Sequence, residues 1–418
     1  MDIIHIVQRY FPAISGSEIY IQRISEILSK RHSIKVLCSN ALDFNAFGNP
    51  GGKFINEYYS EIKNVPIFRF PIKYRYFINK FPLVEYKLIK NILKKLTKLN
   101  IPILDFYNIL LNGPYCPGLL QYLLDCQSDI IHSSCFPFSI NLFALIASKL
   151  NKVPAITTPF YHFANPRYHD QSLLRVLARF DRILTCTKLE ARYLIKNIRI
   201  KRIKDKIELI KMGVDIKKFK KAEPHKFRAK FEIDTNPLIL FCGYKNYEKG
   251  AIHLLQSIKY VIKKIPNAIY LFIGPSTKAF NLVKKALDAE LKQHIINIGV
   301  VPYDNIKIKI NSFAAADVYA MPSRSDAYGI AFLEAFACKK PVIGANIGAT
   351  PEVIRDNIDG LLVPFGNPKI LANAIIKLLK NPELRDKFGE NGYEKIKNQT
   401  WESVSTSIER IYKKLVQK

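Results

Sequence analysis

Cysteine is scarce in this sequence, and its pattern narrows the class of protein. The 418 residues include seven cysteines, and no two of them form a Cys-x-x-Cys pair. This odd number without paired spacing argues against a disulfide scaffold or a zinc ribbon and indicates a reducing compartment. Residues 1–11 show no charged leader before an apolar core. We therefore expect no secretory signal and a cytoplasmic location.

Long hydrophobic runs are also missing. The best candidate for a span of about 18 apolar residues is 103–124, but prolines, a glycine and polar residues interrupt it. The sequence therefore argues against a membrane-spanning helix. Apolar residues still make up 48% of the chain and charged residues 24%, which is enough for real cores and excludes a disordered or collagen-like chain. The length of 418 residues predicts two to three domains.

Acidic residues are few relative to basic ones. Lys and Arg total 64 and Asp and Glu total 35, so the formal charge is 64 − 35 = +29. Such a charge attracts nucleic acid, anionic membranes, nucleotide phosphates or other acidic substrates, and part of it is explained by a coat of surface lysines. No nucleic-acid reader motif or basic stripe with interleaved aromatics is present. Nucleic acid is therefore the least favoured of these partners.

One segment, residues 87–99, concentrates the charge. At 100° per residue its lysines share one helical face and its aliphatic residues share the other: Lys87, Lys90, Lys94, Lys95 and Lys98 against Leu88, Ile89, Ile92, Leu93, Leu96 and Leu99. Such a helix can lie in an anionic membrane interface, on the cytoplasmic face. It can equally pack its apolar stripe on its own domain. The pattern leaves both interpretations open.

Short β-rich runs alternate with longer helical patterns along the chain. The runs are 3–8, 34–38, 129–132, 155–158 and 182–186, then 238–242, 269–273, 295–300, 318–321, 341–344 and 361–363. This alternation predicts parallel α/β sheets. The rhythm restarts after the basic segment 217–237, which we interpret as a hinge between two doubly wound halves. The default site is then the cleft between those halves.

The most informative segment is 321–342. Asp326 lies in a Ser/Gly-containing loop after a predicted strand, and Glu334 falls about one turn into the following helix. Backbone amides at such a helix start suit a phosphate. Carboxylates suit vicinal hydroxyls, because each accepts two hydrogen bonds. Two acids at this spacing also fit an ordinary helix N-terminus, so the whole string matters more than the pair.

That string resembles retaining glycosyltransferases of family 4, which have the GT-B fold and a PS–E–x7–E–A–A–G–PV pattern. Asp326 stands at the first Glu of the pattern, Glu334 matches the second, and Lys339 stands at the usual Gly. Further matches follow in order: Ser15–Glu18 to a GGxE loop, Gly213–Asp215 with Phe219 to GVD–x–F, Gly243–Gly250 to G–R–L–x3–K–G, then Ala316-Asp317, Gly348 with Pro351–Ile354, and Gly360–Pro364. In the Gly243 loop Tyr244 occupies the place of the Arg.

The resemblance implies an α/β protein with two Rossmann-like domains that face a cleft. Residues 1–216 would bind the acceptor, with a helix at 401–418 packing back on them, and residues 217–400 would bind the nucleotide sugar. The chain contains no D-x-D triplet, the motif that holds a metal in other transferases. We therefore expect no cofactor and no metal, with a lysine in the place of the cation.

The resemblance also assigns roles. Lys249 would neutralise the leaving diphosphate. Asp326 would hold the hydroxyls of the transferred sugar, and Glu334 would accept hydrogen bonds from the ribose. His162 would contact the donor sugar near the reacting carbon. Gly16 would let the backbone approach the diphosphate, because it has no Cβ.

The remaining donor contacts are mostly main-chain. The amides near Tyr328, Gly329 and Ile330 would face the sugar and the diphosphate, and the segment around Val301 would pair with the base. Lys245 would supply a second positive charge if its loop turns inward, although a lysine lacks the bidentate fork of arginine.

We therefore expect a retaining glycosyltransferase that uses a nucleotide sugar and a saccharide or lipid-linked acceptor, in cell-surface polysaccharide, glycolipid or glycan biosynthesis. Two alternatives stay open. A nucleotide-sugar 2-epimerase has the same fold but lacks the acid–x7–acid string. A non-catalytic basic adaptor would keep the fold without the activity.

Overall fold

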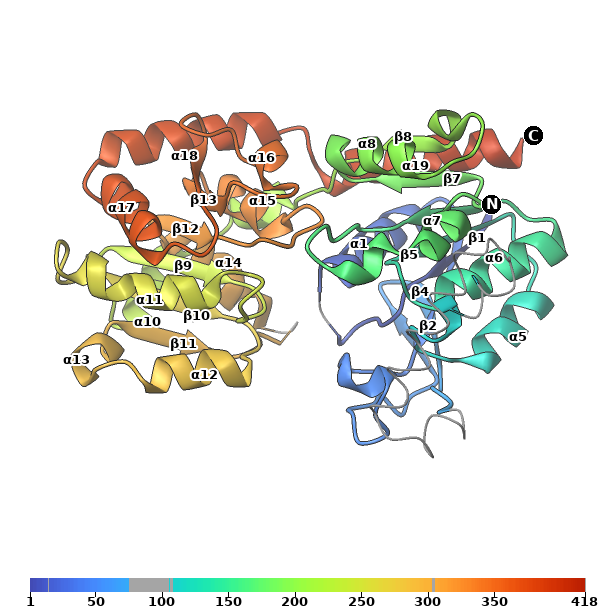
Figure 1. Ribbon diagram of the computed structural model, residues 1–418, viewed down its shortest axis with the longest axis horizontal. Helices are drawn as coiled ribbons and strands as arrows, with labels where there is room; N and C mark the ends of the chain where they lie inside the picture. Colours follow the sequence, from blue (N-terminus) through green and yellow to red (C-terminus); the bar gives the residue numbers. More distant parts are fainter. Residues whose placement is uncertain (14, 75–104, 106–107, 303–304, 418) are drawn as a thin grey trace. The chain divides into compact units, whose positions relative to one another are not determined.

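The computed structural model describes residues 1–13, 15–74, 105, 108–302 and 305–417 (Figure 1). Two compact units divide the chain: unit 1 is Met1–Lys211 with Trp401–Lys418, and unit 2 is Met212–Thr400. The boundary lies after Lys211, whereas the sequence placed it after residue 216. The basic helix predicted over residues 87–99 falls outside the described residues.

Unit 1 is built on an eight-stranded sheet in the order β3-β4-β2-β1-β5-β6-β7-β8. Its strands are β1 (Asp2–Ile6), β2 (Ser33–Ser39), β3 (Tyr59–Ile62), β4 (Val65–Phe70), β5 (Ile130–Ser134), β6 (Ala155–Thr158), β7 (Arg182–Thr185) and β8 (Ile207–Leu209). Neighbouring strands run parallel, except that β3 pairs with β4 antiparallel. Strands β5 and β6 are buried along their whole length, as expected for parallel strands covered on both faces.

Helices of unit 1 cover this sheet (Figure 1). They are α1 (Gly16–Leu28), α5 (Pro117–Asp125), α6 (Ile140–Asn151), α7 (Gln171–Leu177), α8 (Lys188–Asn197) and α19 (Trp401–Val416), with 3-10 turns at Asn45–Phe47, Pro166–His169 and Ile203–Lys206. Local capping explains where α8 begins, because the Thr187 hydroxyl accepts a hydrogen bond from the Glu190 amide at 3.1 Å. The last helix of the chain, α19, packs on α1.

A buried polar network attaches α19 to the sheet. The Tyr412 hydroxyl lies 3.0 Å from His5 Nε2 and 2.6 Å from His132 Nδ1. The other ring nitrogens bond to Ser25 at 2.7 Å and to Thr158 at 2.8 Å. Burial lowers the pKa of His5 to about 3 and that of His132 well below its ordinary value. Both rings are therefore neutral near pH 7, and their nitrogens form hydrogen bonds within the buried core.

Unit 2 is built on a six-stranded parallel sheet in the order β11-β10-β9-β12-β13-β14. The strands are β9 (Leu238–Cys242), β10 (Ile269–Ile273), β11 (Ile295–Ile298), β12 (Val318–Met321), β13 (Val342–Ala345) and β14 (Gly360–Val363). Strands β10 and β11 extend to one side of β9, and β12 to β14 extend to the other. The strand order therefore reverses between β9 and β12, which is the point where doubly wound sheets bind ligands.

The helices of unit 2 are α9 (Ile216–Phe219), α10 (Pro224–Lys230), α11 (Ala251–Ile262), α12 (Lys278–Lys285), α13 (Ala289–Lys292), α14 (Ile306–Ala315), α15 (Ile330–Ala337), α16 (Thr350–Val353), α17 (Pro368–Leu379) and α18 (Pro382–Ile396). The segment 217–237, predicted as a hinge, instead folds within unit 2. It holds α10, which packs on α14. Phe227 is buried there and Arg228 bonds to the Ala315 carbonyl at 2.6 Å, so this basic segment is anchored to the unit.

Candidate functional site

Two loops follow β9 and β12 at the reversal of strand order, and they are fastened to each other. The Arg324 guanidinium donates to both carboxylate oxygens of Glu248 at 2.7 Å, and the Arg324 amide donates to the Glu248 carbonyl at 2.9 Å. Gly250 has a φ of +74°, and a Cβ there would lie 2.2 Å from the Pro322 carbonyl oxygen. Only glycine permits this close approach of the two loops.

The fastened loops bring Lys249 and Asp326 into contact. The Lys249 ammonium is ion-paired with Asp326 Oδ1 and lies 3.4 Å from the Ser325 carbonyl oxygen. The side chains are 22% and 10% exposed. Within the described part of the chain, Asp326 Oδ2 is buried without a hydrogen-bond partner. The site therefore holds a cation on one carboxylate oxygen and an unsatisfied acceptor on the other.

Glu334 lies on α15, in the same unit. Its Oε1 accepts a hydrogen bond from the Lys309 ammonium of α14 at 2.5 Å, and the side chains are 12% and 18% exposed. Sequence reasoning did not single out Lys309. The signal was the Ile-Lys-Ile-Lys-Ile order over residues 306–310, which cannot place every lysine of a helix on its exposed face.

The start of α15 connects these acids. Gly329 precedes the helix with a φ of +89°, and a Cβ there would meet the Phe332 ring at 2.7 Å. Tyr328 is buried, and its hydroxyl accepts a hydrogen bond from the Gln399 amide at 2.6 Å. The first amides of α15, including that of Ile330, thus follow Asp326 directly in the chain. Such amides can bind an anion.

Lys245 does not join Lys249 as a second accessible cation. Its side chain is fully buried, and Nζ donates to Asn297 Oδ1 at 2.6 Å and to the Ile298 carbonyl at 2.9 Å. The phosphate contact predicted for Lys245 does not fit this placement. The reason is local: the backbone of Lys245 pairs with the loop after β10, which directs the side chain toward the end of β11. Val301, the predicted base contact, lies just after β11 and is 9% exposed.

Burial lowers the pKa of Lys245 from 10.5 to about 8. Between these values the unfolded chain binds more protons than the folded chain, so this group makes the free energy of unfolding rise with pH. We expect wild type to gain stability relative to Lys245→Met between pH 8 and 10, measured by urea unfolding. The exposed Lys263→Met is the matched control. Parallel pH curves for wild type and Lys245→Met would contradict this expectation.

The two predicted residues of unit 1 lie after strands of its own sheet. Gly16 begins α1, and the nearby Glu18 is buried in an ion pair with Arg9 at 2.9 Å. His162 follows β6, is half-buried, and packs its ring on Tyr168 with centroids 5.5 Å apart. Both residues thus lie beyond the carboxyl ends of strands, where parallel sheets place binding residues.

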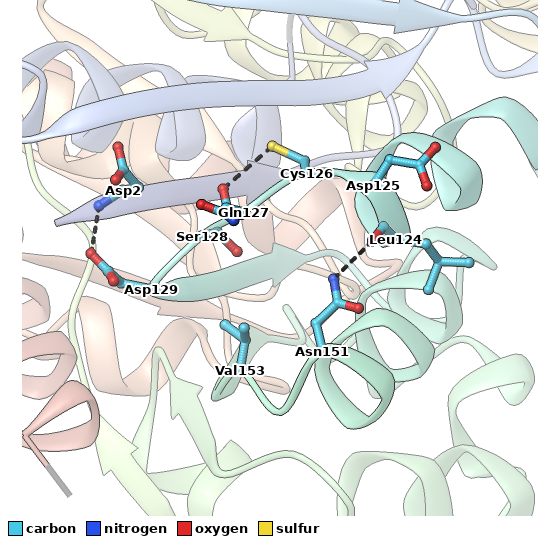
Figure 2. A pocket seen from close by; sticks show the side chains of 9 residues that line it. All are labelled: Asp2, Leu124, Asp125, Cys126, Gln127, Ser128, Asp129, Asn151 and Val153. Carbon is cyan, nitrogen blue, oxygen red and sulfur yellow. Dashed lines mark hydrogen bonds between the residues drawn. The ribbon is translucent and has the colours of Figure 1, made fainter.

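A pocket of unit 1 lies on the opposite edge of that sheet (Figure 2). It is lined by Asp2 at the start of β1, by Asp129 just before β5 and by Asn151 at the end of α6. The Asp129 carboxylate accepts from the Asp2 amide at 2.7 Å, and Asn151 donates to the Leu123 carbonyl at 3.0 Å. These polar groups form hydrogen bonds at the ends of strands and helices. None of the predicted site residues lines this pocket.

Two features are absent from the residues that the structure describes: a membrane-spanning helix and a metal-binding cluster. No helix among them combines the length and the apolar character needed to cross a membrane. No group of three or more His, Cys, Asp or Glu side chains in the part of the chain that the structure describes is placed to hold a metal ion.

Fold and site define a doubly wound α/β protein with ion-paired carboxylates at the reversal of strand order in its second unit. Residues 223–395 match the family model described as glycosyl transferases group 1, and residues 14–218 match the model described as glycosyltransferase family 4. The chain belongs to this family of glycosyltransferases.

Curated relatives match part of the chain. A D-inositol 3-phosphate glycosyltransferase of Saccharomonospora viridis is 25% identical over 57% of this chain and 57% of its own length. A phosphatidyl-myo-inositol mannosyltransferase of Mycobacterium leprae is 31% identical over 42% of this chain and 46% of its own length. The chain thus spans about half the length of the curated relatives it matches.

Solved structures resemble the fold over nearly the whole chain. Anabaena Alr3699/HepE in complex with UDP and glucose has a TM-score of 0.73 at 17% identity, covering 99% of this chain and 100% of that one. WaaG, a glycosyltransferase involved in lipopolysaccharide biosynthesis, has a TM-score of 0.69 at 14% identity, covering 98% and 99%. At these identities the likeness shows the fold, two Rossmann-like α/β domains of the GT-B type.

Proposed function

We propose that the chain is a retaining glycosyltransferase, which moves a sugar from a nucleoside diphosphate sugar to a hydroxyl of a saccharide or lipid-linked acceptor. The observation that carries the proposal is the contact of Lys249 with Asp326 directly before α15, on the unit that also places Glu334. This arrangement offers a cation for a diphosphate and carboxylates for hydroxyls. Relatives named as sugar transferases and a neighbour bound to UDP support the same chemistry.

Stabilisation of the charge on the leaving group would govern the rate of the reaction. As the bond between the anomeric carbon and the diphosphate oxygen breaks, negative charge develops on the diphosphate. Lys249 would leave Asp326 and neutralise that charge, which is the main electrostatic demand of the step. Asp326, released from its cation, would accept hydrogen bonds from the sugar hydroxyls. Lys249 and Asp326, which are paired with each other in the structure, would thus each contact a part of the donor instead.

The acceptor oxygen would form the new bond on the face that the diphosphate leaves, so the configuration is retained. Its proton passes to the departing diphosphate oxygen, and no side-chain nucleophile is required. The protein then contributes position and charge stabilisation. We place the acceptor on unit 1, where His162 follows β6 and Gly16 begins α1. Cell-surface polysaccharide, glycolipid or glycan synthesis at the cytoplasmic face of a membrane is the setting that we propose.

A thermal-shift screen of UDP, GDP, ADP and their sugars tests this function. A nucleotide that binds only the folded chain raises the melting temperature by mass action, so one base should stand out. The matching sugar donor should then be consumed in the presence of acceptor saccharides. Formation of an epimer from the donor alone would instead indicate a 2-epimerase. Absence of any shift, together with absence of donor turnover, would refute the proposal.

A further inference from the structure

One buried cluster of unit 1 lies outside the candidate site, and it joins His5 and His132 to Tyr412. His5 on β1 and His132 on β5 are opposite each other in two paired strands at the centre of the sheet. Tyr412 comes from α19, the helix by which the chain returns from unit 2 to unit 1. All three side chains are fully buried. The last helix is thus attached to the sheet through two imidazole rings.

The direction of each hydrogen bond in this cluster can be assigned from one end. The Ser25 hydroxyl donates to the Ile21 carbonyl at 2.6 Å, so it accepts from His5 Nδ1 at 2.7 Å. A neutral imidazole with its proton on Nδ1 has a bare Nε2, which accepts from the Tyr412 hydroxyl. Tyr412 has then used its one proton, and its oxygen accepts from His132 Nδ1. Both rings are therefore protonated on Nδ1.

The other end of the cluster agrees with this direction. His132 Nε2 is bare and accepts from the Thr158 hydroxyl at 2.8 Å, which in turn accepts from the Tyr20 hydroxyl of α1 at 3.1 Å. In the reverse order the buried Tyr20 hydroxyl would find no acceptor within the cluster. The hydrogen bonds therefore run one way, from Tyr20 to the Ile21 carbonyl, and each proton has its own acceptor.

A proton added to either ring is incompatible with this order. Protonation of His5 makes Nε2 a donor that faces the hydroxyl proton of Tyr412, and protonation of His132 does the same toward Thr158. Each change replaces a buried hydrogen bond by two opposed donors and also buries a charge. Both effects cost free energy unless the added charge is paired.

The groups in contact with the two rings do not pair such a charge. Within the described residues, the side chains that hydrogen-bond to the rings or pack edge-on against them are the opposite imidazole and hydroxyl groups, of which Tyr20 and Tyr412 are titratable. Acids on the two covering helices are paired with other groups: Glu18 with Arg9, Glu26 with Arg23, and Glu409 with Arg31 and His32.

Acid therefore shifts this cluster in one direction. Burial lowers the pKa of His5 from 6.5 to about 3, and burial together with the neighbouring His5 lowers that of His132. A state with α19 released exposes the rings and binds more protons below pH 6.5 than the folded state, so stability is lost as the pH falls through this window. Each ring changes the equilibrium for release by about tenfold for each pH unit below 6.5.

We propose that α19 is an acid-released latch of unit 1: the one-way chain of hydrogen bonds holds the helix on β1 and β5 while both imidazoles are neutral, and protonation of the rings releases it. The inference is independent of the proposed function. Unit 2 contains neither ring, so this release opens unit 1 alone.

The fluorescence of Trp401 tests the latch. Trp401 is the only tryptophan of the chain, is buried, and begins α19. Urea titrations of the full chain between pH 8 and 5, followed by this fluorescence, should show that release takes up about two protons near pH 5.5 and almost none above pH 7.5. His5→Gln and His132→Gln each replace one ring by an amide that does not titrate, so uptake should fall to about one proton. The exposed His225→Gln on α10 is the matched control and should keep about two.

NMR of the full wild-type chain with 15N-labelled histidine keeps the inference testable if a glutamine variant does not fold. Two of the eight histidines should carry their proton on Nδ1 and stay neutral to pH 5.5 while α19 is bound. An unchanged proton uptake in both glutamine variants, or fewer than two histidines protonated on Nδ1 alone, would overturn the inference. A ring that becomes charged at pH 6 with Trp401 still buried would also overturn it.

Discussion

Replacing Lys249 with alanine is expected to lower sugar transfer by about 10²–10³-fold at saturating donor, the range found when one preorganised charge-stabilising group is removed. The physical reason is that the Lys249 ammonium, held beside Asp326, is the cation that the leaving diphosphate would take over. The measurement is kcat with the donor identified by the nucleotide screen. Affinity for the intact donor should fall far less, because the charge develops only as the bond breaks.

A control must separate this effect from damage to the fold. Removing Lys249 leaves the Asp326 carboxylate, 10% exposed, without its cation. The double variant Lys249→Ala with Asp326→Asn removes that cost and should melt close to wild type, yet stay inactive. Lys263→Ala, at an exposed position after α11, should be fully active. Turnover of Lys249→Ala within threefold of wild type would exclude the proposed role of Lys249 in neutralising the leaving diphosphate.

Much of the site could be read from the sequence because topology brings its parts together. Lys249 and Asp326 are 77 positions apart, but each follows a buried apolar run. Once those runs are strands of one parallel sheet, their carboxyl ends share an edge. Gly250 and Gly329 lie in these two loops. Each has a positive φ, and a Cβ at either position would clash with a neighbouring backbone carbonyl or aromatic ring.

Side-chain directions were harder to predict. Lys245 and Lys249 lie in one loop, but the first is buried against Asn297 and the second pairs with Asp326. Backbone pairing with the loop after β10 decides this, and no local pattern encodes it. Lys309 was missed because its ion-pair partner, Glu334, lies 25 positions away on another helix.

The unit boundary shows the same dependence on distant partners. Val214 pairs with Thr400, its amide donates to the Gln399 carbonyl at 3.0 Å, and these contacts hold residues 212–216 in unit 2. The composition change that suggested a boundary near residue 217 reflects surface lysines instead. The partners of His5 and His132 were likewise invisible, since Tyr412 is 407 and 280 positions away.

Ending the chain at Thr400 is expected to unfold unit 1. The deletion removes α19, whose side chains Trp401, Val404, Ile408 and Tyr412 are buried, all in unit 1. At about 1.5–3 kcal/mol for each buried side chain, the loss is about 6–12 kcal/mol. This equals the whole stability of a typical domain, about 5–15 kcal/mol. Loss of the Tyr412 hydroxyl also leaves buried nitrogens of His5 and His132 unpaired, which adds to the cost.

Scanning calorimetry with limited proteolysis measures this effect. The truncated chain should lose the transition of unit 1 and be cleaved within residues 1–211, while unit 2 keeps its own transition because residues 212–400 remain intact. The matched control ends at Tyr412, which keeps every side chain of α19 that is buried in the core. It should melt within a few degrees of the full chain. If the chain ending at Thr400 melts like this control, then α19 does not hold unit 1 together and the buried network around Tyr412 is dispensable.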